Sequence, residues 1–251
     1  MGDLLFDTIA RFQGDRPWGR MLDAGTGRHS LTWMMGLETE SWTAVTGASA
    51  RERALKQALA PDIRPGDRVL TGNWRDPAFL HDEVFDTVLA DYLLGAVEGF
   101  APYFQDQLFA RLRWHTRRDL YVVGLAPYPD VAETPGGQAV LEVARLRDAC
   151  ILLAGHRCYR EYPLDWVCRS LEGAGFRVED AVSVPIVYRE RFLNGQLDVC
   201  VRKLPYIRDA VTRAAMAAHI ERVRARVLDL PEAKAGIRFG EDYVVHGVRS
   251  T

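Results

Sequence analysis

The sequence has few cysteines, no strong excess of charge and no long apolar run, and each feature excludes a class of protein. Its 251 residues carry 32 Lys and Arg against 34 Asp and Glu, which gives a formal net charge of -2. This balance does not indicate binding to nucleic acid or to an anionic membrane surface. No apolar run approaches the ~20 residues of a membrane span, and the start MGDLLFDTIARF lacks a secretory pattern. We therefore predict a cytoplasmic protein without membrane or nucleic-acid partners.

The cysteines also argue against a metal site. Cys150, Cys158, Cys168 and Cys200 include no CxxC pair, and the first two stand in an apolar stretch with helical spacing. Such a setting favours reduced thiols in a core over metal ligands. We predict no bound metal.

The first half of the chain alternates strand-like and helical segments. With 48% hydrophobic residues, the chain is long enough for a sizeable α/β core. Strands are predicted to end at 21–22 and to cover 42–47, 68–73, 85–94 and 119–128, with helices at 3–13, 30–35, 50–59 and 105–116. Strands separated by single helices favour a doubly wound parallel sheet covered on both faces.

The second half changes character. Helical periodicity covers 136–155 and 162–176, and an amphipathic helix is predicted over 207–227. Two alternating segments, 177–192 and 196–204, predict an antiparallel pair of strands. No repeat or obvious linker interrupts the chain, so we interpret residues 1–251 as one domain with an inserted helical cap at about 130–165.

A glycine-rich corner follows the first predicted strand. The sequence LDAGTG places Asp23 at the strand tip, before Gly25 and Gly27. A dinucleotide fingerprint needs a third glycine, where this chain has Ser30, and a carboxylate at position 23 would repel a pyrophosphate. A phosphate-binding P-loop is excluded because no GK[ST] follows. A ligand with a cationic group suits Asp23 better.

The corner and three further motifs resemble the class I S-adenosylmethionine (SAM)-dependent methyltransferases. LDAGTG is similar to that family's first motif, TGNWRDP (71–77) to its adenine loop, FDTVLADYLLGAVEGF (85–100) to its fourth strand, and LEGAGFRVEDA (171–181) to the passage into its final strands. The likeness spans about residues 20–202. It implies a doubly wound, mostly parallel seven-stranded sheet whose last strand is antiparallel, with SAM as cofactor and S-adenosylhomocysteine as product.

The sequence departs from the family pattern at three places. His29 stands at the third glycine, and Arg117, Arg118 and Asp119 replace the glycines before the fifth strand. The acid that holds the ribose diol is also missing, because Ala48 and Ser49 occupy the end of the second strand. Losing that charge-assisted hydrogen bond costs about 1.5–3 kcal/mol of affinity. The departure keeps open a second interpretation, a methyltransferase-fold protein that binds or regulates without efficient catalysis.

The resemblance assigns cofactor contacts residue by residue. Asp23 is expected to attract the methionine ammonium, and the glycines let the backbone approach the ligand closely. Ser49 is the substitute for the ribose acid, and Asn73 with Trp74 would lie near the adenine. The full expected set is Asp23, Gly25, Thr26, Gly27, His29, Ser49, Asn73, Trp74 and Asp91.

The acceptor side is expected to serve an in-line displacement, which depends on alignment and on exclusion of water. Tyr92 and His156 are the catalytic candidates, although a wall tyrosine and a surface histidine are the plainer interpretations. Tyr92 is also a candidate for binding the acceptor, together with Tyr128, Arg147 and Tyr159; Arg147 has an ion pair with Asp148 as its alternative. The family's amine-methylating motif is absent, since ADYL stands in its place. We therefore predict a small-molecule acceptor with an O, N or S nucleophile and keep a homodimer open.

Overall fold

The computed structural model describes residues 4–250. Its strands are β1 (Arg20–Asp23), β2 (Ser41–Thr46), β3 (Arg68–Thr71), β4 (Phe85–Asp91), β5 (Thr116–Leu125), β6 (Phe176–Tyr188) and β7 (Ile237–Arg249). Its helices are α1 (Leu4–Gln13), α2 (Arg28–Met35), α3 (Ser49–Leu59), α4 (Leu93–Ala96), α5 (Gln105–His115), α6 (Pro135–Leu153), α7 (Leu164–Gly173), α8 (Glu190–Lys203), α9 (Ala210–Leu228) and α10 (Pro231–Ala235). Short 3-10 turns follow α3, α4 and α8: η1 (Ala60–Asp62), η2 (Val97–Gly99) and η3 (Leu204–Tyr206).

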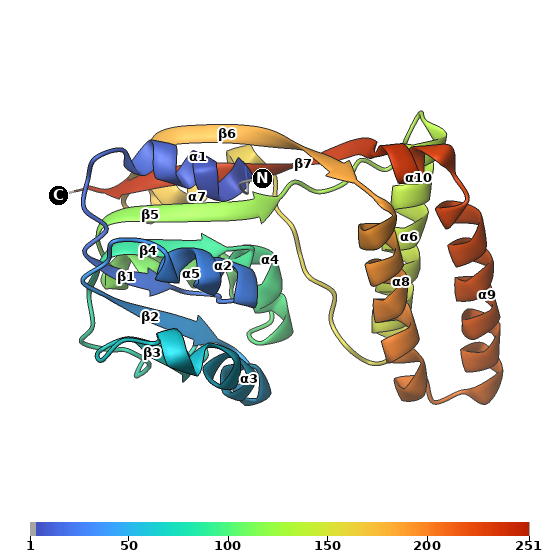
Figure 1. The fold of residues 1–251 in the computed structure, drawn as a ribbon, viewed down its shortest axis with the longest axis horizontal. Helices are drawn as coiled ribbons and strands as arrows, with labels where there is room; N and C mark the ends of the chain where they lie inside the picture. Colours follow the sequence, from blue (N-terminus) through green and yellow to red (C-terminus); the bar gives the residue numbers. More distant parts are fainter. Residues whose placement is uncertain (1–3, 251) are drawn as a thin grey trace. The chain divides into compact units, whose positions relative to one another are not determined.

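The strands form one seven-stranded sheet in the order β3-β2-β1-β4-β5-β7-β6 (Figure 1). Strands β1 to β5 pair in parallel, and β7 runs antiparallel to β5. This confirms the predicted fold class and the antiparallel final strand. The predicted lead-in helix over 3–13 corresponds to α1, with residue 3 outside the described residues.

One predicted strand was wrong. Residues 196–204 fall mainly inside α8, whose fully buried Leu193, Leu197 and Cys200 repeat every three or four positions. That helical period decides the structure, although the same residues also alternate in polarity. The true final strand is β7, which the sequence analysis missed; its segment Tyr243–Val245 is completely covered on both sides.

The chain divides into two compact units. The first comprises residues 1–126, 159–184 and 242–251, and the second comprises 127–158 and 185–241. In the first unit, neighbouring residues of β4 and β5 belong to different apolar clusters: Val88 and Leu120 pack with one, Leu89 and Tyr121 with the other. Because side chains alternate along a strand, the two clusters lie on opposite faces of the sheet. The sheet is therefore buried on both sides, as predicted.

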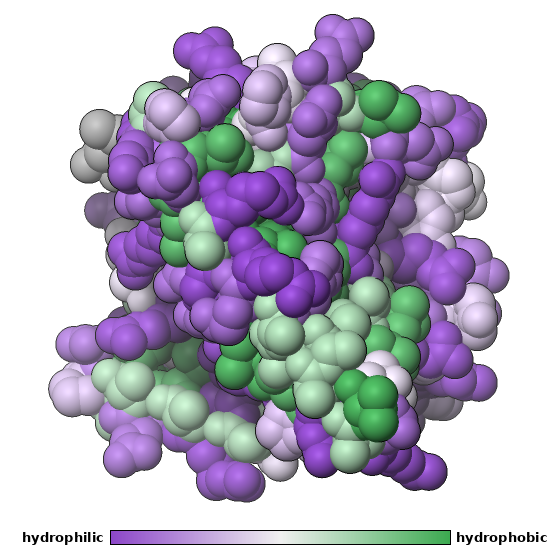
Figure 2. Space-filling view, turned by 90° about the vertical axis from the view of Figure 1, so that its right-hand side faces the viewer, coloured by the Kyte–Doolittle hydropathy of each residue, from purple (hydrophilic) through white to green (hydrophobic). Residues whose placement is uncertain are grey.

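The second unit is built on α6, α8 and α9, which pack together around their own core (Figure 1). Val140, Leu197, Ile220 and Val223 are almost completely buried there. Hydrophilic and apolar side chains are intermixed on the side of the molecule that includes α9 (Figure 2). An open groove of about 610 Å³ in this unit is lined by apolar and polar residues of α6, by the segment 130–132, and by Met216 and His219 of α9.

The cysteines of the described chain are free, and Cys150 and Cys200 are buried in the second unit's core. Burial raises the pKa of the Cys200 thiol to about 12. No group of His, Cys, Asp or Glu side chains within residues 4–250 has the arrangement of a metal site. None of the helices in this range is both long and apolar enough to cross a membrane.

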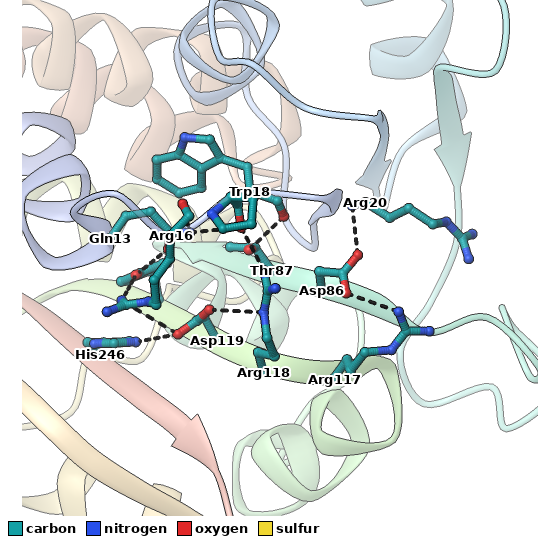
Figure 3. Close-up of polar contacts among 12 residues, drawn as sticks. Gln13, Arg16, Trp18, Arg20, Asp86, Thr87, Arg117, Arg118, Asp119 and His246 are labelled. Carbon is teal, nitrogen blue, oxygen red and sulfur yellow. Dashed lines mark hydrogen bonds and ion pairs between the residues drawn. The ribbon is translucent and has the colours of Figure 1, made fainter.

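A polar network connects the segment after α1 to the end of the sheet at which the parallel strands begin (Figure 3). His246 Nε2 lies 2.8 Å from Asp119 Oδ1, and both side chains are buried. Arg16 approaches the same oxygen at 3.6 Å, and Arg118 donates to the Pro17 carbonyl at 2.6 Å. Arg118 and Asp119, which stand where the family pattern has glycines, lie at the start of β5 and have a structural use there, remote from the carboxyl ends of the strands.

A second branch of the network includes Asp86. Its Oδ2 accepts a hydrogen bond from the Arg20 backbone N–H at 2.9 Å, and its Oδ1 accepts one from Arg117 at 3.0 Å (Figure 3). Thr87 donates to the Trp18 carbonyl at 2.9 Å. Asp86 thus lies at the start of β4, where it fixes the chain entering β1.

Candidate functional site

A pocket of about 300 Å³ lies in the first unit, at the carboxyl ends of the parallel strands. The strand order reverses direction between β1 and β4, and open α/β sheets bind ligands at such a switch point. Turns that follow β1, β2 and β3, together with α4 and η2, supply the wall. The lining comprises Ala24, Gly25, Thr26, Val45, Thr46, Gly47, Ala48, Arg51, Gly72, Asn73, Trp74, Leu93, Ala96, Val97, Phe100 and Tyr159.

Asp23 lies directly behind the turn that lines this pocket. Its side chain is completely buried, and the Gly25 backbone N–H donates to Oδ1 at 3.3 Å. Oδ2 is buried with no hydrogen-bond partner in the described chain. Burial raises the pKa of the Asp23 carboxyl to about 6, against the opposing effect of the Ser30 and Thr26 hydroxyls and the Gly25 N–H. A buried acceptor without a hydrogen-bond partner is stabilised by a donor, and most strongly by a cationic donor.

The glycine turn keeps the backbone close to its neighbours. A Cβ on Gly25 would come within 3.0 Å of Leu93 Cβ, so a larger residue would press on α4. The Thr26 N–H donates to the Val45 carbonyl at 2.7 Å, which fastens the turn to the end of β2. Gly27 is the N-cap of helix α2, and its N–H donates to the Ser30 hydroxyl at 3.1 Å. The third-glycine position of the dinucleotide fingerprint thus has a capping use in this chain.

Asn73 and Trp74 both line the pocket, and their polar atoms are already used within the protein. Trp74 is 3% exposed, and its indole N–H donates to the Ala24 carbonyl at 2.7 Å. The Asn73 amide donates to the Phe100 carbonyl at 2.9 Å and accepts from the Arg75 N–H at 3.0 Å. These residues shape the wall by packing, while their polar groups stabilise the turns around it.

Several expected contacts lie outside the lining. Ser49 is exposed in the first turn of α3. The His29 ring packs against Phe6 of α1, with ring centroids 5.0 Å apart. Asp91 ends β4, and Tyr92 follows in a left-handed conformation (φ 47°) with its N–H donating to the Val123 carbonyl at 2.9 Å.

The acceptor-side candidates are divided between the two units. Tyr159 belongs to the first unit and lines the pocket with 60% of its surface exposed. Tyr128, Arg147 and His156 belong to the second unit. There the Tyr128 hydroxyl contacts that of Tyr188, Arg147 pairs with Asp148 at 2.8 Å, and His156 Nδ1 lies 3.0 Å from Lys203 Nζ.

Arg51 and Phe100 are among the lining residues that sequence reasoning missed. Phe100 is 47% exposed, and its ring lies so close to Gly47 that a Cβ there would be 2.5 Å from it. Arg51 stands in the first turn of α3, three positions beyond Ala48. The sequence held a signal for this turn, because the acid that the resemblance leads one to expect there is missing at Ala48 and Ser49.

Comparisons with solved structures agree with the architecture. A protein from Bacillus halodurans that carries a provisional methyltransferase name is 14% identical, with 100% of both chains covered and a TM-score of 0.63. The cyclopropane synthase MmaA2 from Mycobacterium tuberculosis is 15% identical over 96% of this chain and 84% of its own, with a TM-score of 0.57. Phosphoethanolamine N-methyltransferase 2 from Haemonchus contortus, solved with S-adenosylhomocysteine, is 11% identical over 98% of this chain and 52% of its own, with a TM-score of 0.54.

These similarities establish the fold: the chain has the class I methyltransferase fold. No protein-family model matches the sequence, and no curated protein is similar to it in sequence. The function therefore has to be argued from the site.

Proposed function

We propose that the protein is a SAM-dependent methyltransferase whose acceptor is a small molecule with an O, N or S nucleophile. The fold supports this proposal, because methyltransferases are among the solved structures with the same architecture. The cytoplasmic location, the small-molecule acceptor and the homodimer remain predictions from the sequence.

The observation that carries the proposal is the buried Oδ2 of Asp23, which has no hydrogen-bond partner among the described residues. A fully buried carboxylate is costly unless a donor or cation compensates it. Its position behind Gly25, at the switch point of the sheet, suits the α-ammonium of a bound methionine moiety, directly or through water. The same charge would oppose a diphosphate, which argues against a nicotinamide dinucleotide at this end of the pocket.

In this proposal the chain's own residues bind, orient and shield. When bound, SAM supplies an electrophilic methyl group on a sulfonium. Gly25 and Thr26 offer the backbone for close approach, while Trp74 and Phe100 give apolar walls that exclude water. Tyr92 and Tyr159 are the proposed acceptor contacts of the first unit. The roles of Tyr128, Arg147 and His156 stay predictions.

Calorimetry with S-adenosylhomocysteine tests the proposal. We expect micromolar binding to the wild type and at least a tenfold loss in Asp23→Asn, because the amide removes the charge that meets the ammonium. Asp86→Asn is the matched control. Asp86 is also buried, with 8% of its surface exposed, but it lies at the start of β4, whereas Asp23 lies at the carboxyl end of β1. No binding to the wild type, or equal binding to Asp23→Asn, would contradict the proposal.

A second candidate function is a binding or regulatory protein that keeps the fold without efficient catalysis. The lack of an acid at positions 48 and 49 favours it, since the ribose then loses its usual acceptor. Binding of S-adenosylhomocysteine in the millimolar range, with no methyl transfer to a panel of small phenols, amines and thiols, would favour this candidate.

A further inference from the structure

The part of the pocket wall that follows β2, where a nucleoside would place its ribose, is called the ribose end here. Its charge differs from that of a site that binds a free diol through an acid. Among the described residues that line it, none is acidic and Arg51 carries the single formal charge. In nucleotide-binding α/β sheets, the side chain beyond the second strand meets the ribose; an acid there accepts from the hydroxyls, and an arginine accommodates a phosphate. Arg51 follows the end of β2 by five residues.

Arg51 is also available for a ligand. It forms no ion pair or side-chain hydrogen bond with the residues between 4 and 250. The adjacent acid, Glu52, is occupied by Lys56 at 2.6 Å and by the Thr71 hydroxyl. Arg51 Nη2 lies 3.9 Å from where a Cβ on Gly27 would be, so the guanidinium reaches over the gap between the ends of β1 and β2.

We propose that Arg51 makes the ribose end of this pocket a subsite for an anionic substituent, so that the pocket prefers an adenine nucleoside phosphorylated on its 2′- or 3′-oxygen to one with a free diol. The inference rests on the proposed function only in taking the pocket as a nucleoside site. A free diol is still bound, because the guanidinium N–H groups donate to hydroxyl oxygens. A phosphate adds charge and a bidentate partner for the same group.

The position of the phosphate matters. The buried Asp23 carboxylate lies behind Gly25 and opposes a negative group at that residue, whereas the Arg51 guanidinium, near Gly27, attracts one at the ribose. The two charges together predict that a phosphate on the 2′- or 3′-oxygen strengthens binding and that one on the 5′-oxygen does not.

Calorimetry at low salt tests this with adenosine, its 2′-, 3′- and 5′-monophosphates, and S-adenosylhomocysteine. We expect the 2′- or the 3′-monophosphate to bind at least tenfold more tightly than adenosine and the 5′-monophosphate. Arg51→Ala should abolish that gain, and Arg51→Glu should reverse it while tightening S-adenosylhomocysteine. Arg53→Ala is the matched control, since Arg53 is an exposed arginine on the same helix outside the lining.

The outcomes separate this inference from the proposed function. Tight S-adenosylhomocysteine binding, with no gain from a ribose phosphate and no effect of Arg51→Ala, overturns the inference and leaves the methyltransferase proposal standing. An Arg51-dependent gain from the ribose phosphate, without binding of S-adenosylhomocysteine, supports the inference and overturns the methyltransferase proposal. An equal gain in Arg51→Ala and the wild type also overturns the inference.

Discussion

Asp23 illustrates how a single buried charge couples a site to pH. Its pKa of about 6 in the folded protein exceeds the ordinary value of 3.8, because burial disfavours the carboxylate. A group whose pKa is raised on folding stabilises the fold fully below its unfolded pKa. That contribution is lost as the pH rises through the folded value.

We therefore expect the unliganded protein to lose stability at Asp23 between about pH 4 and pH 6, by an amount on the order of 3 kcal/mol for a shift of about two pKa units. Asp23→Asn cannot ionise and should lack this part of the pH dependence. Urea unfolding of both proteins from pH 4 to 7.5 measures the difference between them. Parallel stability curves over this range would show that Asp23 does not titrate as described.

At the scale of elements, the polar network decides how α1 and the chain after it meet the sheet. The Tyr121 hydroxyl donates to Gln13 Oε1 at 2.6 Å and accepts from Arg16 at 3.2 Å. Tyr121 is completely buried in β5, so its hydroxyl holds the last turn of α1 to the middle of a core strand. Burial also raises the pKa of Tyr121 well above its usual range, which keeps the hydroxyl protonated as a donor.

Removing that hydroxyl should loosen α1. We expect Tyr121→Phe to lower the free energy of unfolding by about 1–3 kcal/mol, because it leaves the Gln13 oxygen buried without its donor. Hydrogen exchange in α1 should also become faster. Tyr243→Phe is a close control, since Tyr243 is equally buried but its hydroxyl has no hydrogen-bond partner among the described residues. A loss of similar size in both variants would assign the effect to packing and not to the network.

At the scale of the whole molecule, the second unit has an apolar core that is separate from the two apolar clusters of the first unit. The first unit contains β1 to β5 and the complete lining of the proposed nucleoside pocket. The second has its own core between α6, α8 and α9. The pocket's shape therefore does not depend on side chains of the second core.

Truncating the second core tests this separation. Leu197 on α8 is fully buried, and we expect Leu197→Ala to cost about 2–5 kcal/mol of stability through lost burial and a residual cavity. Exchange should accelerate in α6, α8 and α9, while affinity for S-adenosylhomocysteine changes less than twofold. Val201→Ala on the same helix, at a residue that is 40% exposed, should leave stability nearly unchanged. A large loss of affinity in Leu197→Ala would show that the pocket depends on the second unit.

The sequence by itself determined the parallel core of the sheet and the corner at its centre. Alternating apolar strands and helices are local signals, and LDAGTG is contiguous, so both can be recognised without knowledge of long-range contacts. Tertiary structure decided the rest. Residues 196–204 fall mainly in a helix because Leu193, Leu197 and Cys200 are spaced so that one helical face is buried. Strand β7 is stabilised by pairing with β5, which lies more than 100 residues earlier in the chain.

The charge at the ribose end likewise depends on the tertiary structure. The absence of an acid at Ala48 and Ser49 is visible in the sequence, but Arg51 is one of many arginines there. Only folding brings it to the pocket wall, beside the turn of Gly27, and engages the neighbouring Glu52 elsewhere. A sequence lists which charges exist, whereas the electrostatic character of a site depends on which of them remain unpaired once the chain has packed.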